Sequence, residues 1–289
     1  MSDSPFPLAA GISYREVFAK LENLPPLSQS LHGLLDLIRN DGASVKDLEE
    51  VIRHDEVISA KILQIANSAY YGAYGAVSSL SRAIMTMGFS EVVSICLCHL
   101  LGDHFDRADA STRASRAVLW KRSHVAAKMA QEMAAERSWP DREEAYTLGL
   151  LHDLGLLVMC LHFHDEYLAI EETARERKIS FRQAEMEYGP THTQIGRWIS
   201  VRWGLPEIYT RVMTFHHEPK DSPSCQEPVK LVYLADVLAR CNESPFLLDA
   251  DETLEYCREL AISGEEWRKY IEKTSAAREE ANRFWSLLA

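Results

Sequence analysis

The stretch GLLHDLGLLVMCLHFHDEY, residues 149–167, places a histidine and an aspartate side by side inside an otherwise apolar run. Polar and charged side chains are costly to bury unless they are hydrogen-bonded or paired with a cation. His152 and Asp153 therefore need partners inside the protein. Two interpretations are open: the pair binds a metal ion and supports chemistry, or it is a hydrogen-bonded remnant in the core.

The segments around this stretch carry apolar residues at helical spacing. In LSQSLHGLLDLIRN (27–40), Leu31, Leu34 and Leu35 form one stripe, and Ser44 is expected to cap the next helix. A further helix is expected to run to Gly72. Other helices are expected at 118–139, 165–178, 180–188, 192–203, 206–216 and 226–242. Since no segment shows strand periodicity, the predicted fold class is all-α.

The composition excludes several classes of partner. The 289 residues are 46% hydrophobic and 26% charged, with a net charge of −12, which argues against nucleic acid as a partner. The run LGLLVMCL is far shorter than the roughly 20 apolar residues of a membrane span. MSDSPFPLAAG does not look like a signal peptide, and six cysteines in apolar surroundings suggest reduced thiols. We therefore expect a cytoplasmic protein without a membrane partner.

Three divisions of the chain are predicted: an N-terminal helical part (14–106), a helical core (107–245) and a C-terminal helical extension (246–289). The polar stretch DRADASTRASR (106–116) is the best candidate boundary between the first two. In the extension, residues spaced by three and four form a heptad-like seam: Trp267, Ile271, Thr274, Arg278, Ala281, Trp285 and Leu288. The favoured interpretation is a helix folded back onto the body, and the alternative is a homodimer seam interrupted by Arg278.

Four more polar residues lie downstream of the His-Asp pair, on or near expected helices: His192, His216, His217 and Asp236. Imidazole and carboxylate groups together suit first-row divalent metals such as Fe, Mn, Ni or Zn. Helices can converge such groups on one pocket, as they do in helix bundles. We expect these six residues to converge. Six further histidines are predicted to be hydrogen-bonded core residues: His32, His54, His99, His104, His162 and His164.

The motif LLHDLG, with these downstream residues, resembles the HD superfamily of metal-dependent phosphohydrolases. Three upstream segments make the resemblance more specific: LPPLSQSL (24–31), RHDEVISAKILQIANSAYYG (53–72) and VSSLSRAIMTMGFSEV (77–92). With LPEIYTRVMTFHHEP (205–219), they resemble the HDOD domain, an HD-related output domain of bacterial signalling, over about residues 18–240. The resemblance implies N-terminal helices packed on an HD-like core, and generally no defined catalytic activity.

The chain departs from the enzymatic relatives at two positions. Their metal ligands begin with a histidine one helix earlier, where LWKRSHVAAKMA (119–130) has Arg122. His124 lies two residues on, about 200° around a helix, and is not expected to substitute. Leu156 stands where relatives that cleave cyclic dinucleotides carry a lysine. Their Gly-Tyr-Pro signature is missing, and Tyr188-Gly189-Pro190 is interpreted as a coincidence.

Arg122 has a physical consequence, because a guanidinium is always charged and only donates hydrogen bonds. We predict that it pairs with Asp153 and Asp236 and replaces one metal ion of the relatives. The second ligand set of the relatives is retained as Asp153, His192, His216 and His217, so at most one divalent metal is expected.

Two functions follow from these residues. The leading hypothesis is a non-catalytic signalling output module that acts through contacts with a signalling protein. Since no input domain fits in 289 residues, its signal is expected to come from another protein or a small molecule. The alternative is a metal-dependent phosphohydrolase of a nucleotide or cyclic dinucleotide.

Two features of the N-terminal part have structural interpretations as well. Asn67 is expected to hydrogen-bond the loop that follows it, rather than a ligand. Tyr70, Tyr71 and Tyr74 form an aromatic turn, which is either a docking surface or a cover over the core.

Overall fold

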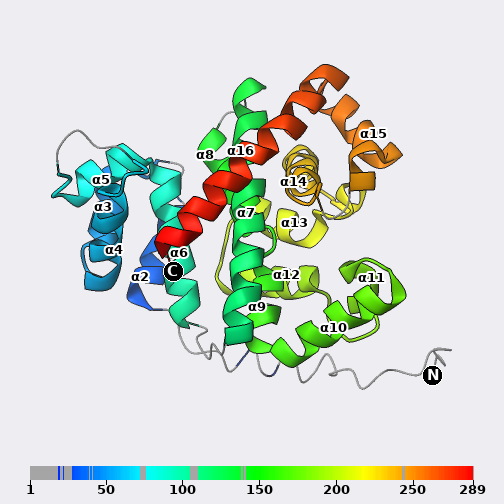
Figure 1. Ribbon diagram of the computed structural model, residues 1–289, viewed down its shortest axis with the longest axis horizontal. Coiled ribbons are helices and arrows are strands. Elements are labelled where there is room, and N and C mark those ends of the chain that lie inside the picture. The colour runs from blue at the N-terminus through cyan, green and yellow to red at the C-terminus, as the bar shows by residue number, and fades with distance from the viewer. Residues whose placement is uncertain are drawn as a thin grey trace.

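The computed structural model describes residues 28–71, 76–104, 110–242 and 245–288, except 39, 41, 138 and 140, together with residues 19 and 22. All regular elements in this part of the chain are helices, which confirms the all-α fold class (Figure 1). Helix α7 runs through the middle of the molecule, with α2 to α6 on one side of it and α10 to α15 on the other.

The N-terminal helices are α2 (Gln29–Ile38), α3 (Val45–Ile52), α4 (Glu56–Ala66), α5 (Leu80–Met87) and α6 (Phe89–His104). The predicted stripe on α2 is buried at Leu31, Leu34 and Leu35. Ser44 caps α3 as predicted, in a reciprocal capping box with Asp47. These helices therefore form where the apolar spacing and the caps place them.

The predicted helix end at Gly72 is wrong, since α4 already ends at Ala66. The Asn67 side chain donates to the carbonyls of Leu63 and Val77 and accepts from the Val77 amide, each at 2.8 Å. These bonds tie the helix end to the loop that follows, which confirms the interpretation of Asn67. Of the three tyrosines, Tyr74 lies outside the described residues, Tyr71 packs against the core, and the Tyr70 ring lies 5.4 Å from the Arg283 guanidinium.

The central helices are α7 (Ala110–Glu136), α8 (Arg142–Leu151), α9 (Leu154–His162), α10 (His164–Arg177), α11 (Phe181–Glu185), α12 (His192–Arg202), α13 (Glu207–Phe215) and α14 (Gln226–Ala239). Residues 110–116 of the polar stretch belong to α7, and residues 105–109 lie outside the described part. Every residue of α9 from Leu154 to Leu161 is buried, as expected of a helix that is apolar all round. The stretch Arg142–His162 is apolar enough for a membrane span, but 94% of its most apolar window is buried inside the protein.

The C-terminal part consists of a short 3-10 helix η2 (Pro245–Asp249), α15 (Asp251–Glu259) and the long α16 (Gly264–Leu288), while a second 3-10 helix η1 (Pro219–Asp221) precedes α14. Trp267, Ala277 and Ala281 of α16 share an apolar cluster with α7 and α14. The favoured interpretation, a helix folded back onto the body, is confirmed. Arg278 donates to the carbonyls of Leu238 and Ala239, so it satisfies the C-terminal end of α14.

The prediction for the remaining histidines is wrong in part. His32 and His54 are exposed: His32 lies on the polar face of α2, and His54 lies in the turn between α3 and α4. His99, His162 and His164 are half-buried, and the side chain of His104 lies outside the description. The six cysteines are unpaired thiols, as predicted, and only Cys225 is not buried.

Candidate metal centre

The turn between α8 and α9 presents the His-Asp pair. His152 directly follows the last residue of α8, and Asp153 precedes α9 with φ −98° and ψ 19°, so the two helices are not continuous. The Asp153 side chain makes no capping bond to α9 and points instead into the protein. The Nδ1 atom of His152 lies 2.7 Å from the Gly149 carbonyl, which leaves Nε2 facing the centre.

His192 is held by a buried carboxylate that sequence reasoning missed. It begins α12 behind Thr191, whose capping box with Gln194 fixes the helix start. Glu185, at the end of α11, accepts from the His192 backbone amide at 2.9 Å and lies 2.8 Å from its Nδ1. A carboxylate on one ring nitrogen orients the other toward a metal in many metalloproteins. Glu185 thus turns the Nε2 lone pair of His192 to the centre.

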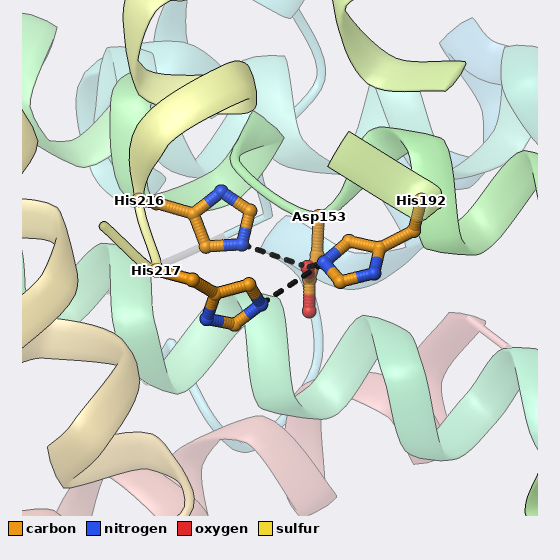
Figure 2. A group of neighbouring side chains, drawn as sticks. All are labelled: Asp153, His192, His216 and His217. Atoms are coloured by element: carbon orange, nitrogen blue, oxygen red, sulfur yellow. Dashed lines mark hydrogen bonds and ion pairs between the residues drawn. The ribbon is translucent and has the colours of Figure 1, made fainter. Parts of the chain in front are cut away.

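His216 and His217 follow the end of α13, where Pro219 two residues later begins a short 3-10 helix. The Nδ1 atom of His216 lies 3.1 Å from the Val212 carbonyl, so its Nε2 also faces inward. Figure 2 shows these two rings and that of His192 turned toward Asp153.

The geometry of this four-residue group matches a metal site. The Oδ1 atom of Asp153 lies 3.4 Å from Nε2 of His216 and 3.6 Å from Nε2 of His192. The Nε2 atoms of His192 and His217 are 3.0 Å apart. Ligands bound tetrahedrally to an ion at about 2.0–2.1 Å are themselves about 3.3 Å apart. The structure therefore brings ligand atoms of Asp153, His192, His216 and His217 within 4.8 Å of one another, and these three distances are close to the spacing that one ion requires.

Buried atoms without partners give an independent test of this fit. Among the described residues, Nε2 of His152, Nε2 of His216, Oδ1 of Asp153 and Oδ1 of Asp236 have no hydrogen-bond partner. Nε2 of His216 and Oδ1 of Asp153 belong to the four-residue group, whereas Nε2 of His152 and Oδ1 of Asp236 lie beside it, 3.5 Å apart. Buried polar atoms are normally satisfied, and a cation between Asp153 and His216 would satisfy the first two. The donor set fits a divalent metal, with Asp153, His192, His216 and His217 as the residues that would hold it.

The charges of the centre support the same conclusion. Burial alone would raise the pKa of Asp153, but His152 and Arg122 hold it well below its usual range. Burial lowers the pKa of His217, and the neighbouring imidazoles His216 and His192 lower it further. Burial would also lower the pKa of His192, but Glu185 and Asp153 raise it. The group thus contains an ionised carboxylate, Asp153. Of its imidazoles, His192 lies beside carboxylates, and His217 resists protonation.

Arg122 lies at this centre, as the sequence predicted. Its Nη2 atom is 2.7 Å from Oδ2 of Asp153, and the two side chains are only 16% and 6% exposed. The two oxygens of Asp153 therefore have different neighbours: Oδ2 faces the guanidinium, and Oδ1 faces His192 and His216.

The predicted pair of Arg122 with Asp236 is not what the structure shows. Arg240, four residues after Asp236 on α14, pairs with that carboxylate instead. Asp236 is also 3.5 Å from Nε2 of His152, and Arg240 holds its pKa below the usual range against the opposing effect of burial. A second group of ligand type, His152, Asp153 and Asp236, thus has a guanidinium on each carboxylate.

Sequence reasoning missed two functional residues, for different reasons. The spacing of Asp236 and Arg240 is that of a helical ion pair and was available as a signal. Glu185 lies seven residues before His192 in a separate short helix, and nothing in its spacing identifies it.

His124 is buried against Phe284 and Tyr146, away from the centre, as predicted.

A cavity of about 930 Å³ adjoins the metal centre. It is lined at one end by Arg122, Asp153, His192, His217 and Arg240, and elsewhere by α10 and the segment 179–182. Tyr188, Gly189 and Pro190 line a different, small cavity, so they have no part in this one.

Comparisons with known proteins give the same fold. A protein of unknown function from Geobacter sulfurreducens, described as an HDOD domain protein, is 20% identical, with a TM-score of 0.74 over 94% of this chain and 96% of that one. A protein of Marinobacter aquaeolei VT8, provisionally named for signal transduction, is 22% identical, with a TM-score of 0.79 over 94% of this chain and 61% of that one. A provisionally named phosphohydrolase of Shewanella amazonensis SB2B is 21% identical, with a TM-score of 0.71 over 94% of this chain and 98% of that one.

An uncharacterised protein of Treponema pallidum (strain Nichols) is 25% identical over 246 residues, which are 83% of this chain. The chain spans 46% of that relative, about half its length. The HDOD domain profile matches residues 24–219, which include the N-terminal helices, the His-Asp pair and the three downstream histidines. The chain belongs to the HDOD domain family.

Proposed function

We propose that the chain is a regulatory module of bacterial signal transduction that binds one divalent ion and does not turn over phosphoesters. The observation that carries the proposal is the 2.7 Å contact between Arg122 and Asp153. A phosphohydrolase with two metal ions uses them to bind the attacking and the leaving oxygens. Here a guanidinium lies on each carboxylate of the second ligand group, where the second ion would bind.

The retained group of Asp153, His192, His216 and His217 supports binding of the single ion. An ion held there supplies a Lewis acid and a positive charge for an anionic group. The protein's own residues orient its ligands, through Glu185 on His192 and Val212 on His216. We propose Fe, Mn, Ni or Zn as the ion, because imidazole and carboxylate suit these metals. The proposed partner is a signalling protein of the cytoplasm.

Turnover measurements test the absence of hydrolysis. The metal-reconstituted protein is assayed with a nucleoside triphosphate, a cyclic dinucleotide and bis(4-nitrophenyl) phosphate. We expect no product beyond that formed by a metal-loaded H192A protein, whose centre lacks one ligand. Product formation that depends on His192 would overturn the proposal.

A second candidate function is a metal-dependent phosphohydrolase of a nucleotide or cyclic dinucleotide. One observation favours it: four convergent ligands and a partly exposed guanidinium adjoin a cavity large enough for such a substrate. In that case Arg122 would neutralise the phosphate. The same turnover assay distinguishes the two functions, and His192-dependent product from any of the three substrates would favour this one.

A further inference from the structure

The cavity beside the metal centre is divided into a charged end and an apolar wall. At the charged end, Arg122 and Arg240 flank the metal ligands. The wall is formed mainly by apolar and aromatic side chains: Leu119, Leu156, Tyr167, Leu168, Ile179 and Phe181. Leu156, three residues after Asp153, places an apolar side chain in this wall.

The charged end carries enough positive charge for one acid group. Arg122, Arg240 and one divalent ion bring four positive charges, and Asp153, Asp236 and Glu185 bring three negative charges. The surplus of one positive charge appears only with the ion bound. An anion with a single acid group would neutralise it, whereas a polyphosphate would leave several charges uncompensated.

The mouth of the cavity adds no further surplus of positive charge. Arg175 pairs with Glu172, and Arg182 pairs with Glu218. The phenol of Tyr167 donates to Glu171 at 2.7 Å. Arg175 and Arg182 are therefore each matched by a carboxylate, and Glu171 adds one more carboxylate to the lining, which argues against a chain of phosphates along the cavity.

The wall suits a ring. The rings of Tyr167 and Phe181 lie 5.5 Å apart at an interplanar angle of 40°, and Leu156 and Leu119 are on the same lining. Aromatic rings pack favourably in such tilted or edge arrangements. The volume of about 930 Å³ is within the range of sites for small organic ligands.

We propose that this cavity binds a small organic anion with one acid group and an apolar, ring-containing body. The acid group contacts the ion, Arg122 and Arg240, and the ring packs on Phe181 and Tyr167. The proposal rests on the proposed function, because it requires one bound ion and a ligand that is not consumed. It gives the chemical class of the small molecule through which the module would receive its signal.

Two phosphonates with the same acid group test the proposal, since neither has a phosphoester bond to hydrolyse. Isothermal titration calorimetry of the metal-loaded protein compares phenylphosphonate with methylphosphonate. We expect phenylphosphonate to bind about tenfold more tightly, because only its ring gains from the apolar wall. Chelation of the ion is expected to abolish binding of both compounds.

Substitutions in the wall distinguish the contribution of the ring to binding from that of the acid group. Phe181→Ala is expected to remove the tenfold preference and leave methylphosphonate unchanged. Phe246→Ala, at an exposed phenylalanine outside the cavity lining, is the matched control and should change neither affinity. Because Phe181 also packs on the core, Leu168, which is 38% exposed, provides a second test. Leu168→Glu should weaken both phosphonates, and Leu168→Lys should strengthen both.

Equal affinities for the two phosphonates, or no binding of either up to about 10 mM, would overturn the inference. The metal content of the same samples separates this failure from that of the proposed function. One ion per chain with no preference between the phosphonates refutes only the ligand. Phosphoester turnover refutes the proposed function, whichever phosphonate binds better.

Discussion

Arg122 and Arg240 each donate to a carboxylate that lies within 3.6 Å of the Nε2 atom of His152. A guanidinium delivers one positive charge and directed hydrogen bonds, but it cannot accept a ligand or activate a water. A metal ion provides both functions. At the scale of single residues, the two arginines keep the carboxylates compensated without supplying the chemistry of a second ion.

Glu185 tests how firmly the retained ligands are held. Glu185→Gln replaces the charged acceptor of the His192 Nδ1 proton by a neutral one, so the ring is oriented less firmly. We expect the dissociation constant for Zn²⁺ to rise about 10- to 100-fold in a competition titration with a chelating dye.

Glu187→Gln is the matched control, because Glu187 pairs with Arg177 on the surface, two residues away. An unchanged Zn²⁺ affinity in the Glu185 variant would show that the carboxylate does not orient the ligand.

The sequence was sufficient to predict some contacts at this scale and not others. The pairing of Arg122 with Asp153 follows from one substitution in a recognisable motif. The partner of Asp236 was misassigned, because the choice between Arg122 and Arg240 depends on how α7 and α14 approach each other. The contact of Glu185 with His192 could not be predicted, because Glu185 lies in a five-residue helix that is too short to show an apolar period.

At the scale of helices, α9 and α12 approach so closely that only a glycine fits between them. A Cβ atom on Gly155 would lie 1.9 Å from the His192 carbonyl oxygen and 2.5 Å from the Gly196 amide nitrogen. Both contacts are with backbone, which cannot move aside as a flexible side chain can. Gly155 therefore fixes the distance between Asp153 at the start of α9 and His192 at the start of α12.

Gly155→Ala is expected to lower the free energy of unfolding by about 3 kcal/mol, because α9 and α12 must separate. Urea denaturation followed by circular dichroism measures the change. Gly264→Ala is the control: a Cβ there meets nothing within 4 Å, and we expect a change of no more than about 0.5 kcal/mol. Equal stabilities of the two variants would contradict this account of the packing.

Helix positions were largely predictable, because apolar spacing and caps are local signals. The end of α4 was not, because Asn67 binds Val77 across ten residues of chain. The heptad-like seam of α16 was compatible with packing on the body of the protein or on a second copy of the chain. Only the fold shows that α7 and α14 pack against it. Arg278 in that seam caps α14, which is a role no sequence period reveals.

At the scale of the whole molecule, one buried polar cluster joins the N-terminal helices, the central helices and α16. Lys128 of α7 lies 3.2 Å from Glu91 of α6 and 3.0 Å from Glu280 of α16. His124, one turn earlier on α7, stacks on Phe284 with ring centroids 4.8 Å apart. Burial and the charge of Lys128 lower the pKa of His124 to about 3, so this ring is neutral at physiological pH.

This neutral histidine predicts a pH dependence of stability. The folded pKa of about 3 lies below the ordinary value of 6.5, so between these values the unfolded chain binds the proton and folding is penalised. The contribution of His124 is complete above pH 6.5 and is lost as the pH falls toward 3. From pH 7 to pH 5, the wild type should lose about 2 kcal/mol more unfolding free energy than His124→Gln.

Urea titrations of both proteins at the two pH values measure this difference. The other titrating groups are common to both proteins, and their effects cancel in the comparison. Identical losses would show that His124 is not held neutral by its burial.

The most direct test of the central claim is the metal content of the wild type and Arg122→His after reconstitution with Zn²⁺ or Mn²⁺, measured by inductively coupled plasma mass spectrometry. Arg113→His, at an exposed position of the same helix, is the control. We expect one ion per chain in the wild type and the control, and more than one in Arg122→His, because an imidazole there releases Asp153 and adds a ligand. Two ions in the wild type, or an unchanged content in Arg122→His, would contradict the claim that a guanidinium has replaced a metal ion.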